Sequence, residues 1–202
     1  GRIITTIYTN PTASSITYGQ TLANSTLSGG RAIRPDYSTQ VSGTFAWTTP
    51  TTKPDVGNSQ SFEVTFTPSD ATNFATATRN VTVTVNKATP TITGTAVATA
   101  VYGTLVKDIS ISGLTATFGS ETVSGSWAFS NIPTNNVCPS VGNTTTYSAS
   151  FTPTDNTHFN TVNRNICPTI TPKDLTVTAN NKTITYGGGR ENAGGTYEGF
   201  VN

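Results

Sequence analysis

The sequence has little charge. Charged residues make up 10% of the 202 residues, and 11 basic side chains against 10 acidic ones leave a formal net charge of +1. A nearly neutral chain has no strong field with which to attract the phosphates of nucleic acid or an anionic membrane surface. We therefore expect no nucleic acid and no membrane insertion among the interactions of this protein.

Side chains that carry catalysis or bind metals are also scarce. The chain has two Cys, no Met and a single His, His158. One His cannot form a His-based metal cluster, and a Ser-His-Asp triad would have to rest on this residue alone. We expect no enzymatic activity, no catalytic residues, and no metal or cofactor site.

Long apolar runs are missing as well. No stretch approaches the 18 or more apolar residues of a membrane-spanning helix, and residues 1–6 lack the apolar segment of a signal peptide. If the protein is secreted, its signal has been removed or lies outside this sequence. In place of apolar runs the chain is rich in Thr, Ser and Asn, which suit strands, turns and caps better than helices. This composition is typical of the outside of a bacterial cell and predicts a secreted or cell-surface protein.

An internal repeat organises the whole chain. The dipeptides Tyr18-Gly19, Tyr102-Gly103 and Tyr186-Gly187 recur at a constant spacing of 84 residues. The longer matching segments are 41–47 with 123–129, 62–70 with 147–155, and 73–80 with 158–165.

Each copy of the repeat is predicted to be made of strands. Phe62, Val64 and Phe66 alternate with polar residues, as do the valines of segment 81–85, which is the period of a sheet with one buried face. About seven short strands in about 84 residues predict an all-β fold of tandem immunoglobulin-like β-sandwich domains. We place the first domain at 1–86, the second at 87–172, and the leading strands of an incomplete third at 173–202.

The repeated segments resemble those of a known family. A Tyr-Gly motif, the strand 43–47, the corner 66–70 and the closing strand 81–85 are similar to the bacterial immunoglobulin-like repeats of large surface proteins. The third start, residues 173–187, resembles the opening of the related MBG-type or YGX repeats. The resemblance implies a stalk or adhesin module without a common active site, because a fold alone does not transfer a function.

The incomplete third copy permits three interpretations. It is a docked tail of a truncated repeat, a strand donor that adds to a neighbouring chain, or a segment wrongly assigned to the repeat. For strand addition the candidate residues are the apolar ones of this segment: Leu175, Val177, Ile184 and Tyr186.

The two cysteines, Cys138 and Cys167, both lie in the second copy and have no counterpart in the first. We expect an intradomain disulfide, which would close a loop of about 29 residues and stabilise the domain by roughly 3.5 kcal/mol. A bond between two chains and a pair of free thiols are the alternatives. The spacing lacks the CxxC pattern of a zinc site.

Acidic and imidazole side chains lie close together in the sequence at one corner of the second copy. Asp155 and His158 lie in a turn whose counterpart in the first copy contains Asp70 and Asn73, so we interpret them as turn-forming residues. Capping of the turn is favoured over calcium binding, because no further carboxylates cluster there.

Arg31, Arg34 and Tyr37 form the one basic and aromatic cluster of the sequence, in the longer loop of the first copy. Arginine and aromatic side chains suit contacts with a glycan or a carboxylate. A solvated loop is the simpler interpretation of the same residues.

The leading hypothesis for the function is non-enzymatic. We expect a structural module of an extracellular bacterial surface protein or fibre, a stalk or spacer that also joins subunits by C-terminal strand addition. Its partners would be neighbouring immunoglobulin-like repeats or copies of itself. The alternative is an adhesin module that binds a host glycan or protein through the loop at Arg31, Arg34 and Tyr37.

Overall fold

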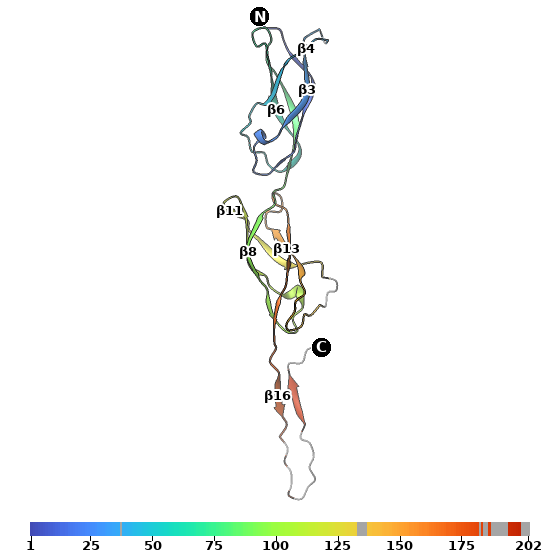
Figure 1. Ribbon diagram of the computed structural model, residues 1–202, viewed down its shortest axis with the longest axis vertical. Coiled ribbons are helices and arrows are strands. Elements are labelled where there is room, and N and C mark those ends of the chain that lie inside the picture. The colour runs from blue at the N-terminus through green and yellow to red at the C-terminus, as the bar shows by residue number, and fades with distance from the viewer. Residues whose placement is uncertain (37, 133–136, 182, 184–185, 187–193, 199–202) are drawn as a thin grey trace. The chain divides into compact units, whose positions relative to one another are not determined.

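The computed structural model describes the whole chain except residues 37, 133–136, 182, 184–185, 187–193 and 199–202. The described residues form the strands β1 to β17 and two short 3₁₀ turns, η1 and η2 (Figure 1). The prediction of an all-β chain is therefore confirmed.

The strands fall into two compact units. Unit 1 comprises Gly1–Pro90 and Asp155–Asn160, and unit 2 comprises Thr91–Thr154 and Thr161–Asn202. The short turn belongs to unit 1 because it hydrogen-bonds to both backbone groups of Ala88. The Ala88 N–H donates to the His158 carbonyl at 2.8 Å, and the Asn160 N–H donates to the Ala88 carbonyl at 2.8 Å.

Unit 1 contains two sheets. One has the strand order β1-β3-β4 and the other has the order β2-β7-β6-β5. Neighbouring strands are antiparallel except β2 and β7, which are parallel. The elements are β1 (Thr6–Ala13), β2 (Ile16–Thr17), η1 (Leu22–Asn24), β3 (Leu27–Ile33), β4 (Gln40–Val41), β5 (Gly43–Trp47), β6 (Gly57–Pro68) and β7 (Ala77–Asn86).

Unit 2 repeats this plan element by element. Its sheets have the orders β11-β10-β8 and β12-β13-β14, with a parallel pair of β9 and β15 that corresponds to β2 and the end of β7. The elements are β8 (Thr91–Val97), β9 (Thr99–Val101), η2 (Val106–Asp108), β10 (Ser112–Phe118), β11 (Glu121–Thr122), β12 (Gly125–Phe129), β13 (Tyr147–Pro153), β14 (Val162–Ile166) and β15 (Thr169–Thr171).

A third strand pair follows at the C-terminal end of the sequence. β16 (Thr176–Ala179) and β17 (Gly195–Glu198) are antiparallel, with Thr176 opposite Glu198 and Ala179 opposite Gly195. Figure 1 shows β16 beside this partner strand. The pair corresponds to β1 with β3 in unit 1 and to β8 with β10 in unit 2. The hairpin thus occupies the place in the sequence that the opening strand pairs occupy in units 1 and 2.

The buried apolar residues of unit 1 form two clusters. Ile7 of β1 and Ala32 of β3 pack against Phe66 of β6, which belongs to the other sheet. A second cluster contains Trp47, Leu22 and the buried valines of β6 and β7. The alternation seen in the sequence thus places one face of each strand inside, where burial of apolar surface stabilises the fold.

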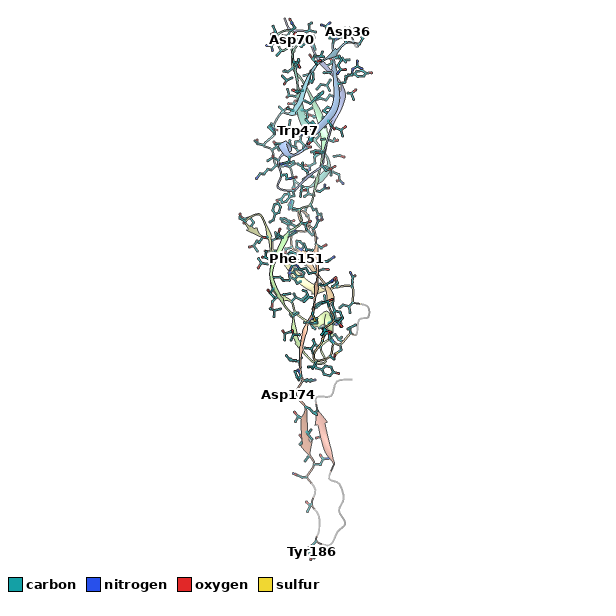
Figure 2. All side chains as sticks on the ribbon, viewed as in Figure 1. Asp36, Trp47, Asp70, Phe151, Asp174 and Tyr186 are labelled. Atoms are coloured by element: carbon teal, nitrogen blue, oxygen red, sulfur yellow. The ribbon has the colours of Figure 1, made fainter. Side chains whose placement is uncertain are left out.

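The two units build one corner of the core with different chemistry. In unit 1 the Trp47 indole N–H donates to the Ser25 carbonyl at 3.0 Å, and the Ser25 hydroxyl donates to the Ser14 carbonyl at 2.6 Å. Figure 2 shows Trp47 among the side chains of unit 1. Unit 2 has apolar residues at the three matching positions, namely Ala98, Ile109 and Phe129. The exchange of Trp and Phe between the two repeats therefore accompanies a change of the buried partners.

A glycine begins the strand that carries these aromatic residues in both units. A Cβ atom added to Gly43 would lie 2.5 Å from the Phe66 ring and 2.3 Å from the Thr67 carbonyl oxygen. A Cβ atom on Gly125 would lie 2.5 Å from the Phe151 ring. Only glycine allows the ring of the paired strand to cover the backbone this closely.

The long last strand of unit 1 is interrupted in unit 2. β7 runs from Ala77 to Asn86 without a break, whereas Cys167 and Pro168 separate β14 from β15. Pro168 occupies the position of Val83, and proline has no N–H to donate to a neighbouring strand. The ladder between β13 and β14 ends accordingly, with Ile166 opposite Tyr147.

Candidate functional site

The C-terminal hairpin exposes the apolar residues that the sequence singled out for strand addition. Leu175 is 52% exposed and Val177 in β16 is 58% exposed. Leu175 stands just before β16, two positions from Val177, and we refer to these two exposed side chains as the apolar patch. Tyr186 is fully exposed, whereas Ile184 lies outside the described residues.

The side chains of β16 are exposed to solvent, and its outer edge is unpaired in the described ladders. All four residues of β16 are exposed, and its one partner in the described ladders is β17. A two-stranded hairpin is only marginally stable in water, and it gains stability when further strands cover its apolar face. The outer edge of β16 presents backbone N–H and C=O groups that an added strand can pair with.

The two arginines that the sequence analysis placed in one loop lie at its start, Arg31 within β3 and Arg34 just after it, and both guanidinium groups lie near aromatic rings. The guanidinium carbon of Arg31 is 5.7 Å from the centre of the Tyr8 ring, and that of Arg34 is 5.2 Å from the centre of the Phe74 ring. Neither arginine forms an ion pair with a described carboxylate, and the Nε atom of each is buried without an acceptor. These two Nε donors are thus unpaired but shielded from solvent. Tyr37 lies outside the described residues.

The loop beside these arginines is held by Asp36. Its carboxylate accepts the backbone N–H groups of Ser38 and Thr39, both at 3.0 Å. These hydrogen bonds, that from Thr39 first, favour the charged form and lower the pKa of Asp36 to about 2. Asp36 is therefore committed to the loop, and the Ser38 carbonyl in turn accepts a hydrogen bond from Arg31 at 3.2 Å.

His158 lies between two carboxylates within unit 1. Its Nδ1 atom is 2.6 Å from Asp155 Oδ2, and its Nε2 atom is 2.6 Å from Asp55 Oδ1. The ring stacks on Tyr18 with a distance of 4.3 Å between ring centres. Only the protonated imidazole can donate from both nitrogens at once. The hydrogen bond to Asp155 first, and then that to Asp55, raise the pKa of His158.

Only part of the His158 environment can be found from the sequence. The spacing Asp155 to His158 repeats that of Asp70 to Asn73, where the Asn73 side chain donates to Asp70 at 2.7 Å. This repeated spacing predicts the contact with Asp155. No local signal points to Asp55, which lies more than 100 residues away in the sequence.

The predicted intradomain disulfide is wrong. Cys138 and Cys167 are both free thiols. The backbone beside Cys138 is fixed to η2, since the Val106 N–H donates to the Val137 carbonyl at 2.9 Å. The exposed Cys167 instead lies beside Asn143, with its Sγ atom 3.5 Å from the Asn143 carbonyl oxygen. The two thiols are thus held by different segments, which their spacing along the sequence does not reveal.

The comparisons with known proteins were negative. No protein-family model matches the chain, and no curated protein matches it. Over the described residues, no helix is long and apolar enough to cross a membrane. In the same part of the chain, no three His, Cys, Asp or Glu side chains are grouped as metal ligands would be.

Proposed function

We propose that the chain is a structural, non-enzymatic segment of an extracellular bacterial surface protein or fibre. In this proposal, units 1 and 2 are immunoglobulin-like β-sandwich repeats that act as a stalk or spacer. Copies join through strand addition by the C-terminal hairpin of β16 and β17.

The observation that carries this proposal is the third strand pair. It repeats the pairs β1 with β3 and β8 with β10, and it leaves Leu175 and Val177 exposed. In unit 1 the corresponding pair buries Ile7 and Ala32 against strands of a second sheet. The hairpin therefore carries a face that other strands cover in a complete repeat, and a second copy can supply them.

The test is to remove the apolar patch and measure association. We expect the full chain to associate in sedimentation velocity and to form elongated assemblies in electron microscopy. Leu175→Asn with Val177→Asn should abolish both, while Thr178→Asn, on the opposite face of β16, should leave both unchanged. If the double variant associates as the unchanged chain does, joining by the hairpin is refuted.

The arginines of unit 1 favour a second candidate, a module that binds a host glycan or an acidic protein surface. Arg31 and Arg34 lie over aromatic rings and have no carboxylate partner among the described residues. A glycan array that includes acidic sugars tests this candidate. Binding that is lost in Arg34→Ala and in Arg31→Ala, but kept in Arg2→Ala, would support it.

A further inference from the structure

One edge of β7 in unit 1 is largely unpaired. β7 pairs with β6 along most of its length on one side. On the other side β2 pairs with it only at Val85 and Asn86. The part of β7 before Val85 therefore has a free edge in the described ladders.

The direction of the free backbone groups follows from one hydrogen bond. The Tyr18 N–H donates to the Asn86 carbonyl at 2.8 Å, so the polar backbone groups of Asn86 face the β2 side. Successive residues of a strand alternate in this respect, so those of Thr82 and Asn80 face the same side. Beyond the end of β2 they have no partner strand. An unpaired edge of this kind is a template for another strand.

A groove of about 420 Å³ runs along this edge. Residues 80–84 of β7 form one wall, and residues from Asn10 to Ser15 form the other. None of the lining residues is charged. The wall from β1 includes the buried Pro11, which has no N–H, so the groove offers a full set of backbone partners on the β7 side only.

We propose that this groove is the acceptor site for β16 of a second copy, which adds to the free edge of β7. The inference rests on the proposed function, that copies join by strand addition, and it names the surface that receives the strand. The contact would be heterologous, because a C-terminal strand of one copy meets unit 1 of the next.

Length and charge match between the groove and β16. The five residues 80–84 span about 16 Å and the four residues of β16 about 13 Å, at roughly 3.3 Å per residue. Both surfaces are neutral, so no charge is buried without a partner. With β16 in the groove, the face that carries Leu175 and Val177 turns toward Pro11 and the core.

The corresponding edge of unit 2 is less suitable. Cys167 and Pro168 interrupt it between β14 and β15, so no continuous strand spans the positions of residues 80–84. The Thr169 N–H, at the position of Thr84, already donates to the Ala98 carbonyl at 2.8 Å. Unit 1 is therefore the acceptor in this proposal.

The experiment compares two variants of the whole chain. One lacks a working donor strand, and the other lacks a working acceptor edge. Leu175→Asn with Val177→Asn removes the donor patch. Thr82→Pro removes an N–H that faces away from β6, so no backbone hydrogen bond from this N–H to β6 is lost. Thr82→Ser is the matched control, and Thr82→Lys is a second acceptor variant in case the proline disturbs folding. Sedimentation velocity measures association, and hydrogen exchange of the unchanged chain reports on the amides of Asn80 and Thr82.

We expect each blocked variant to remain monomeric and an equal mixture of the two to form dimers, because one free donor and one free acceptor remain. In the unchanged chain, exchange at Thr82 should slow by at least about tenfold on association. If both acceptor variants still associate and hydrogen exchange at Thr82 does not slow in the unchanged chain, the groove is not the acceptor site. That result would leave the proposed joining by strand addition intact. Unchanged association of the donor variant would refute the proposed function itself. A chain that stays monomeric up to about 1 mM would refute both.

Discussion

Trp47→Phe tests how much the buried polar corner of unit 1 contributes to its stability. Trp47 is 7% exposed, and its indole N–H donates a hydrogen bond to the carbonyl of Ser25. Ser25 is buried as well. Phenylalanine at this position keeps an aromatic ring in the core but offers no donor. The carbonyl of Ser25, a residue that is 4% exposed, would then lose that hydrogen bond.

The expected loss has two parts. A buried acceptor that loses its partner costs about 1–3 kcal/mol, and the smaller ring leaves a gap that costs about 1 kcal/mol more. A total of about 2–4 kcal/mol is a large share of the 5–15 kcal/mol typical of a domain. For a unit of this size it corresponds to a fall of roughly 10–20 °C in melting temperature.

Differential scanning calorimetry measures this fall, and Trp127 fluorescence follows unit 2 separately in the same variant. Trp127→Phe is the matched control, since Trp127 is half-buried against Phe151 and forms no described hydrogen bond through its indole. It should cost less than about 1.5 kcal/mol. If Trp47→Phe lowers the melting temperature of unit 1 by less than about 3 °C, the reasoning is wrong.

Three further predictions concern the glycines, the histidine and the thiols. Gly43→Ala should destabilise unit 1 by roughly 1–3 kcal/mol in chemical denaturation, because the new Cβ meets a ring and a carbonyl, whereas Gly57→Ala meets only a flexible Gln side chain and should cost less. The raised pKa of His158 means that its contribution to stability is complete below the unfolded value of about 6.5 and is lost as pH rises through the folded value. The melting temperature of unit 1 should therefore fall as pH increases through that window, and this fall should disappear in His158→Asn; a slope that persists in the variant would contradict the assignment. Both thiols should react with a thiol reagent without prior reduction, Cys167 faster than Cys138, and a mass gain of two hydrogens on reduction would disprove free thiols.

The structural features that recur in each copy of the repeat are the ones that the sequence predicts best. The all-β character follows from alternation, as in Phe62, Val64 and Phe66, because a period of two fits only a strand with one buried face. The Tyr-Gly spacing also locates the start of the third strand pair, since β16 precedes Tyr186 much as β1 precedes Tyr18. Local periodicity is enough for these features because each one depends on neighbours along the chain.

Contacts between segments far apart in the sequence cannot be predicted from local periodicity. Whether Cys138 and Cys167 can form a disulfide depends on where two separate segments are anchored, and in this fold both thiols are free. The contact of His158 with Asp55 joins parts of the chain far apart in the sequence. The groove beside β7 arises because β1 and β2 belong to different sheets, which no local pattern encodes. These features depend on tertiary packing, and only the folded chain reveals them.

The break at Pro168 determines the valency of the proposed assembly. A chain with one donor strand and one acceptor groove has two attachment points, and such molecules polymerise into unbranched filaments. A second groove in unit 2, like that of unit 1, would raise the number of attachment points to three and allow branching into a network. Cys167 and Pro168 interrupt that edge. In the proposed assembly this interruption would favour a linear polymer over a gel.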